Sequence, residues 1–417
     1  MQVKRHRRRD GKSPLLRRLS GRKLRLATAG GTAAALVLTG AGIAVGSTVG
    51  FGTHQVGQTT GKGLVVSDDQ VLKPLGQRLE TQLGKFMGST VSPDGRFLAA
   101  TSTDKSVALQ IFDLKSYKLI WSVGTAPGVS QSLSDGTVGQ EGPTYSPDGK
   151  FLWLPQQNGL TRFPVNAAGT LGTPTSVPIP AVNGHSALVG QTRYSPDGST
   201  LYAAINGQNT VVALNPSTGA VEHTWNVGIA PRELAFVGGK LYVSNEGGRQ
   251  AQAGDTTMDS YGTAVPANGY LGTSTTGTVS VIDTANPSAA VGSIAVGLHP
   301  TAMYASGNAL FVANTNSDTV SVIDAAKDKV VQTIETRPWP SSNVGYEPDG
   351  IALTKDGHLL VSLGRANAVA VYRYGGTPQE PVSYIGLLPT DYYPATVAIA
   401  GGQVVVTNTR GIDARGP

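Results

Sequence analysis

Short apolar runs separated by tight polar turns fill most of the chain beyond about residue 85. In such a turn Pro presets φ for the first central position, and Gly accepts the positive φ that closes the turn. Four turns share this chemistry: Ser-Pro-Asp-Gly at 92–95, 146–149 and 195–198, and a weaker Lys-Asp-Gly at 355–357. The apolar runs that follow them are 97–100, 151–154, 201–204 and 359–362. Each run has the length and composition of a β-strand.

Three further turns occupy equivalent places before apolar runs: Gly238-Gly239, Gly307-Asn308 and Gly401-Gly402. The turn glycines are then 95, 149, 198, 239, 307, 357 and 402, so seven units recur at steps of 41 to 68 residues. Strand-built units of this size are typical of propeller blades, each a four-stranded antiparallel sheet. The sequence therefore predicts an all-β, seven-bladed β-propeller over residues 63–417. A β-sandwich, the alternative, does not explain seven recurrences.

Two departures from the repeat need an explanation. The longest step contains an insertion at 246–275, and a loop of this length is usually functional or disordered. We expect it to project from one face and to cover the channel, contact a partner or form a flexible decoration. The last unit supplies only two strands, and two candidate strands near the start of the repeat region are unassigned. We therefore predict that residues 63–85 pair with 395–408, so that both termini close the ring in one blade.

The N-terminal segment is typical of an export signal. Residues 1–25 carry eleven Lys or Arg and one acid, residues 26–53 carry no charge, and 54–62 read as a linker. A basic region followed by an apolar one is the pattern of a signal peptide or a signal anchor. Cleavage or retention stays open, as does the choice between general and twin-arginine export. The basic end is expected in the cytoplasm and the repeat region outside it, secreted or anchored to the membrane by 26–53 alone.

Charge and cysteine content exclude several classes of function. Residues 26–417 carry 22 Lys or Arg and 26 Asp or Glu. A mildly acidic folded region lacks the basic patch that nucleic-acid binding requires, so no nucleic-acid partner is predicted. The chain has no cysteine, which excludes disulfides, thiolate metal sites and thiol catalysis.

Candidate binding residues lie in the segments that lead into the inner strands of the predicted blades. These segments meet at one mouth of the channel, and converging charged and aromatic groups are the default binding hypothesis. Arg232 and His299 take equivalent places in successive blades and together suit an anion. The expected partner is an anionic small molecule, a cell-wall polymer or a protein. The candidate binding residues are Glu141, His185, Arg232, Arg249, His299, Glu347, Asp349 and Tyr393.

Catalytic motifs are missing from the sequence. It has no Gly-x-Ser-x-Gly elbow, no His-Glu-x-x-His helix and no phosphate-cradling Gly-rich loop. No catalytic residue, metal ligand or cofactor is predicted, and a binding or scaffold module is the leading hypothesis. The alternative is a hydrolase acting on ester bonds, of the lactonase type.

One unit carries a specific resemblance. Residues 296–323 follow the pattern VG-x-x-P, LFVAN, TVSVID, which is similar to the YVTN-repeat β-propeller family over about 85–417. The family is known as a fold more than as one activity. Residues 246–257 and 386–417 also resemble proteins in which such a propeller precedes an alkaline-phosphatase-type phosphoesterase domain. That resemblance implies the non-catalytic half of a truncated or split metal-dependent phosphoesterase, or a stand-alone relative whose propeller kept only recognition, because the family's metal site belongs to the second domain.

Overall fold

The computed structural model describes residues 55, 57–66, 70–103, 107–124, 133, 137–260, 263–337 and 345–409. The basic segment 1–25 and the apolar segment 26–53 lie outside these residues, so the expected export signal does too. In the described part no helix is long and apolar enough to cross a membrane.

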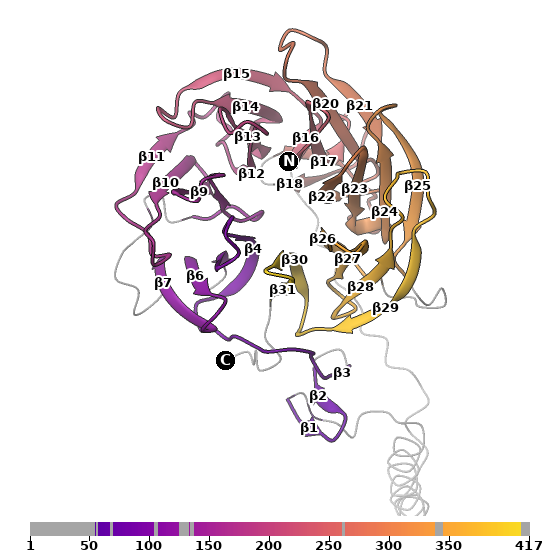
Figure 1. The fold of residues 1–417 in the computed structure, drawn as a ribbon. Helices are drawn as coiled ribbons and strands as arrows, with labels where there is room; N and C mark the ends of the chain where they lie inside the picture. Colours follow the sequence, from indigo (N-terminus) through magenta and orange to yellow (C-terminus); the bar gives the residue numbers. More distant parts are fainter. Residues whose placement is uncertain are drawn as a thin grey trace, which may run out of the picture.

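Six four-stranded antiparallel sheets surround a central axis in the described residues (Figure 1). The first three are formed by β4 (Lys85–Val91), β5 (Phe97–Thr103), β6 (Ala108–Asp113), β7 (Lys118–Gly124); β8 (Thr144–Tyr145), β9 (Phe151–Gln156), β10 (Gly159–Pro164), β11 (Thr175–Pro178); and β12 (Val189–Tyr194), β13 (Leu201–Ile205), β14 (Thr210–Leu214), β15 (Val221–Asn226). The next three are formed by β16 (Ile229–Val237), β17 (Lys240–Gly248), β20 (Thr278–Asp283), β21 (Gly292–Ala295); β22 (Pro300–Ser306), β23 (Ala309–Asn314), β24 (Thr319–Asp324), β25 (Lys329–Glu335); and β26 (Pro348–Leu353), β27 (His358–Leu363), β28 (Ala368–Arg373), β29 (Ser383–Pro389). The first strand of each sheet faces the axis and the last lies on the outside (Figure 1).

Smaller elements complete the described structure. A two-stranded sheet lies between β26 and β4, and a separate three-stranded sheet precedes the ring. A hairpin forms within the insertion, and two 3₁₀ turns follow β13 and β23. The two-stranded sheet is β30 (Pro394–Ala400) and β31 (Gln403–Asn408), and the three-stranded sheet is β1 (Thr59–Thr60), β2 (Gly63–Val65) and β3 (Val71–Leu72). The hairpin of the insertion is β18 (Thr257–Ser260) and β19 (Thr263–Pro266), and the 3₁₀ turns are η2 (Asn206–Gln208) and η3 (Thr315–Ser317).

The repeated Ser-Pro-Asp-Gly turn joins the inner strand to the second strand, as the sequence predicts. The Ser92 hydroxyl donates to Asp94 Oδ1 at 2.6 Å and accepts the Phe97 N–H at 2.9 Å. Gly95 has φ of 74°, which a side chain would disfavour. The same side-chain bond recurs from Ser146 to Asp148 and from Ser195 to Asp197. These aspartates therefore serve the turn.

The hydrophobic core lies between neighbouring sheets. Phe311 and Val322 of one sheet pack with Leu359 and Tyr372 of the next, and all four are at most 2% exposed. Alternate positions on each strand face the two neighbouring sheets, so the strands read as continuous apolar runs. Truncating a core aromatic such as Phe311 to Ala costs about 3–5 kcal/mol.

The predicted closure of the ring by strand pairing is wrong. In the described residues β2 pairs with β1 and β3, and the partner of β31 is β30, so no ladder joins 63–85 to 395–408. Residues 73–84 form no strand because they lack the alternation of apolar and polar residues that a ladder needs. They nevertheless tie the two ends together. Leu75 N–H donates to the Pro389 carbonyl at 3.1 Å, and Arg78 Nε lies 2.9 Å from Asp391 Oδ2.

The insertion at 246–275 packs on the ring along part of its length. Its first residues extend β17, and its hairpin places Val265, fully buried, against Ile229 and Ala230 of β16. Met258 of β18 packs on the same cluster. The hairpin is therefore anchored over the inner strand of the fourth sheet.

Candidate functional site

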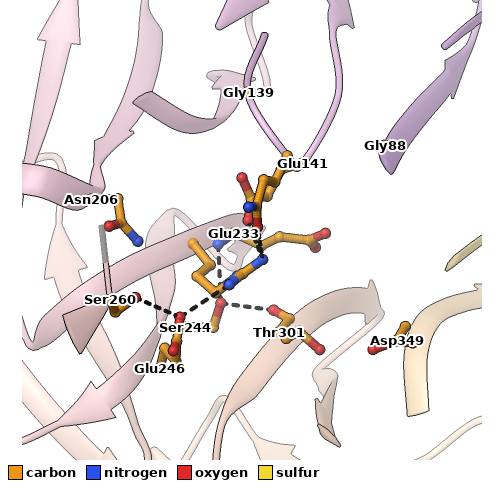
Figure 2. Close-up of polar contacts among 12 residues, drawn as sticks. Gly88, Gly139, Glu141, Asn206, Glu233, Ser244, Glu246, Ser260, Thr301 and Asp349 are labelled. Atoms are coloured by element: carbon orange, nitrogen blue, oxygen red, sulfur yellow. Dashed lines mark hydrogen bonds and ion pairs between the residues drawn. The ribbon is translucent and has the colours of Figure 1, made fainter. Parts of the chain in front are cut away.

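A cavity of about 720 Å³ lies among the inner strands, at the end where each strand begins. Its lining comes from the sheets that start with β4, β16, β22 and β26, from the β30–β31 pair, from the approach to β8 and from the insertion hairpin. Figure 2 shows Glu141, Glu246 and Asp349 arranged around it. Its ionisable lining residues are Glu141, Arg232, Glu233, Glu246, Asp259, His299, Glu347, Asp349 and Tyr393.

Three of these residues have a left-handed backbone conformation. His299, Glu347 and Tyr393 have φ of 53°, 52° and 61°, and each directly precedes the proline that starts or adjoins its inner strand. A non-glycine residue with positive φ costs of order 1 kcal/mol and persists only where its surroundings impose it. Ala230 takes the same position in the fourth sheet, with φ of 54°.

For Ala230, Glu347 and Tyr393 the preceding sheet imposes this conformation through an Asn or Asp side chain. Asp318 Oδ1 accepts the Glu347 N–H at 3.0 Å, and Asn367 Oδ1 accepts the Tyr393 N–H at 2.8 Å. Asn209 Oδ1 accepts the Ala230 N–H at 2.8 Å in the same way. Each acceptor lies at the turn between the second and third strands of its own sheet. The turn of one sheet therefore sets the cavity residue of the next.

On one wall Arg232 is held between two carboxylates. Its Nη2 lies 2.8 Å from Glu141 Oε1, and its Nη1 lies 3.0 Å from Glu246 Oε2. Ser260 of the insertion donates to the same Glu246 oxygen at 3.1 Å (Figure 2). Burial opposes the ionisation of Glu246, whose side chain is 5% exposed, but Arg232 and the other groups that contact this carboxyl together lower its pKa. Burial raises the pKa of Glu141 in spite of the same arginine.

His299 is neutral at ordinary pH. Its Nδ1 lies 3.4 Å from Glu246 Oε1, a long contact. Burial lowers the pKa of His299 to about 4, and the Glu246 charge only partly compensates. The imidazole therefore contributes a polar wall and no positive charge to the cavity.

The opposite wall holds two carboxyls with different partners. Glu347 accepts the Tyr393 hydroxyl at 2.9 Å on Oε2 and lies 2.7 Å from Arg365 Nε through Oε1. Asp349 Oδ2 is buried with no hydrogen-bond partner within bonding distance among the described residues, Oδ1 has a 3.5 Å contact with Thr315, and the Tyr393 hydroxyl lies near the carboxyl. Burial, reinforced by the Glu347 charge, raises the pKa of Asp349 to about 8. Asp349 is therefore protonated at neutral pH. Glu347, in contrast to Asp349, has two close partners, Tyr393 and Arg365.

Solved structures share this ring of sheets. A chain of Kuenenia stuttgartiensis hydrazine synthase matches with a TM-score of 0.56 at 16% identity, over 80% of this chain and 98% of that one. The WD40 repeats of RRP9 match with a TM-score of 0.59 at 12% identity, over 81% and 91%. Virginiamycin B lyase from Staphylococcus aureus matches with a TM-score of 0.55 at 14% identity, over 81% and 96%. The fold is a β-propeller. No protein-family model and no curated protein matches the sequence.

The propeller brings six of the eight predicted binding residues to one cavity, namely Glu141, Arg232, His299, Glu347, Asp349 and Tyr393. The other two lie elsewhere. His185 is exposed in a turn with Val182 and precedes the inner strand by too many residues to face the channel. Arg249 lies in the insertion, where its Nη1 is 2.7 Å from Asp255 Oδ2.

The sequence analysis missed three acidic residues of the cavity. Glu233 lies within β16, Glu246 within β17 and Asp259 within β18. The Oε2 atom of Glu233 accepts the Met303 N–H at 2.9 Å, and burial raises the pKa of Glu233 to about 7. No local pattern marks Glu233, but Glu246 could have been noticed as the continuation of an apolar strand.

The electrostatics of the propeller cavity favour positive charge. Six carboxyl side chains line it, and the arginine that lines it, Arg232, already contacts two of them. The physical basis for anion recognition by Arg232 and His299 is therefore lost. Within the described ranges no group of three or more His, Asp or Glu side chains is arranged to hold a metal ion. An organic cation is the ligand that this lining suits.

Proposed function

We propose that this chain is a β-propeller binding module whose channel cavity takes a ligand with protonated amine groups. The observation that carries the proposal is the excess of carboxyls around a cavity of about 720 Å³, a volume usual for small-molecule sites. With no ligand cation present, Glu233 and Asp349 reduce this charge by holding protons, with pKa values near 7 and 8. A protonated amine would take the place of those protons.

Binding would therefore release protons. A cation beside Asp349 lowers the pKa of that carboxyl, so near pH 7 the complex loses a proton that the free protein holds. Affinity should rise between pH 6 and 8 and level off above pH 8. The probe is 1,4-diaminobutane, with the neutral 1,4-butanediol as its match. Calorimetry in phosphate and in Tris, which differ in ionisation enthalpy, measures the proton release.

A cavity-filling variant locates the binding. Ala395 lines the cavity from β30, and Ala395→Trp fills part of it, whereas Ala395→Ser changes the volume little. We expect the diamine to bind the Ser variant like the parent and the Trp variant at least tenfold more weakly. Equal binding to both variants, or equal affinity for the diol and the diamine, contradicts the proposal.

The finer features of the fold and its location are part of the same proposal. We infer that β30 and β31 form the inner half of a seventh blade of the YVTN type. The basic segment 1–25 and the apolar segment 26–53 support export of the propeller to the extracytoplasmic side. Accessibility of the propeller to protease added outside intact cells tests this. Protection of the folded propeller until the membrane is broken argues against export.

A second candidate function is favoured by the pair Glu347 and Asp349. A carboxyl whose pKa is raised by its surroundings can act as a general acid near neutral pH. Asp349, protonated near neutral pH, could donate a proton to the leaving oxygen of an ester or lactone. Turnover of p-nitrophenyl acetate and γ-butyrolactone that disappears in Asp349→Asn would support this hydrolase. Turnover that persists in the variant would exclude Asp349 as its acid.

A further inference from the structure

A second pocket lies at the other end of the inner strands. It has a volume of about 290 Å³ and is lined by the last residues of β4, β8 and β12 and by the turns that follow them. Val91, Pro93 and Pro147 give it apolar walls, and Arg193 is the charged residue among those that line it. We propose that this pocket binds a small carboxylate with an apolar body, through Tyr145 and Arg193. The proposal is independent of the ligand in the main cavity.

Tyr145 presents an unused hydroxyl. The residue is 7% exposed, and its hydroxyl has no hydrogen-bond partner among the described residues. Its ring packs in the core cluster with Phe97 and Leu152, which fixes its position. A buried hydroxyl without a partner costs of order 1–3 kcal/mol, a cost that a ligand acceptor reaching it from the pocket would recover.

Arg193 and Tyr194 supply the other donors of the pocket. Arg193 Nε donates to the Leu234 carbonyl at 3.0 Å, Nη2 has a long 3.5 Å contact with Gln191, and the nearby Glu233 favours the charged form of the guanidinium. The Tyr194 hydroxyl oxygen accepts Trp153 Nε1–H at 2.8 Å, which leaves the Tyr194 proton to donate. The hydroxyls of Thr144, Ser146 and Ser195 already donate their protons to other groups. A guanidinium with neighbouring hydroxyl donors favours an anionic acceptor.

The aspartates of the neighbouring turns do not oppose an anion strongly. Asp94 and Asp148 each accept a hydrogen bond from the serine of their own turn. Arg96 Nη1 lies 3.9 Å from Asp94, and Lys150 Nζ lies 3.1 Å from Asp148, so these two negative charges have positive neighbours. Asp197 of the third turn accepts hydrogen bonds from Ser195 and Ser199 instead. No Asp or Glu is among the residues that line the pocket itself.

The test uses benzoate and the neutral benzyl alcohol on the full chain, by calorimetry or ligand-observed NMR. Tyr145→Phe removes only the hydroxyl, which makes no hydrogen bond to any described residue, so thermal stability should not fall. Benzoate affinity should drop about tenfold, the effect of one hydrogen bond to a charged acceptor. Thr90→Trp, which fills the pocket from β4, should abolish binding.

A matched variant controls for the loss of a buried hydroxyl. The Tyr372 hydroxyl is also buried and has no hydrogen-bond partner in the described part of the chain, and Tyr372 is not among the residues that line either pocket. Tyr372→Phe and Ala395→Trp should both bind benzoate like the parent. The proposal is overturned if benzoate does not bind at 10 mM, if benzyl alcohol binds equally well, or if Tyr145→Phe and Thr90→Trp leave the affinity unchanged.

Discussion

Asp349→Asn should stabilise the propeller, by an amount that grows with pH. The carboxyl has an ordinary pKa of 3.8, and burial beside Glu347 raises it to about 8 in the folded chain. Above pH 3.8 the unfolded chain releases this proton and the folded chain keeps it, so the free energy of unfolding falls as pH rises towards 8. Each pH unit in that window costs about 1.4 kcal/mol, which reaches about 4 kcal/mol at pH 7.

The amide that replaces the Asp349 carboxyl carries no charge at any pH and keeps an acceptor for Thr315. We expect the variant to unfold only slightly above the parent's temperature near pH 4.5 and several degrees above it at pH 8. Thermal unfolding followed by circular dichroism across this range measures the difference. The matched variant is Asp356→Asn, whose exposed carboxylate has a lowered pKa and should show no such gain. A stability difference that does not change with pH refutes the reasoning.

Three further predictions follow from the contacts of the cavity. Arg232→Met leaves two buried carboxylates without their cation and should destabilise the fold by about 3–5 kcal/mol, seen as a lower melting temperature. His299 should stay neutral, so its Cε1 proton resonance should not titrate between pH 5.5 and 8. Asn367→Ala removes the acceptor of the Tyr393 N–H and should cost about 1–2 kcal/mol in urea unfolding, whereas Asn215→Ala in an outer turn should cost less.

The repeat was predictable because its turns require particular residues. Only Gly fits the last position of the Ser-Pro-Asp-Gly turn comfortably, so Gly95 and its equivalents mark each blade in the sequence. The spacing of these turns also locates the residues that directly precede each inner strand, which is why Glu347 and Tyr393 could be expected at the channel. His185 was misplaced because Leu188 takes that position in its sheet.

The rest of the site depends on contacts that no local pattern contains. The register of β16 against β17 shifts between Pro231 and Leu234, so alternation along the strand could not show which way Glu233 points. Glu246 was assigned to the insertion, but β17 continues through it to Gly248. The closure at residues 63–85 failed because strand pairing depends on partners far away in the sequence. Side-chain bonds such as Arg78 to Asp391 replace the missing ladder.

Because the residues before the inner strands share a left-handed backbone conformation, their side chains can change ligand recognition without changing the fold. Ala230, His299, Glu347 and Tyr393 share one backbone conformation but differ in size, charge and polarity. Because an Asn or Asp of the neighbouring sheet sets three of these conformations, the side chain itself is free to vary. A protein engineer could therefore exchange these residues one blade at a time, and natural duplication of a blade would carry its acceptor to the next blade. The side chains that face the channel at these positions can therefore change while the backbone that carries them keeps its conformation.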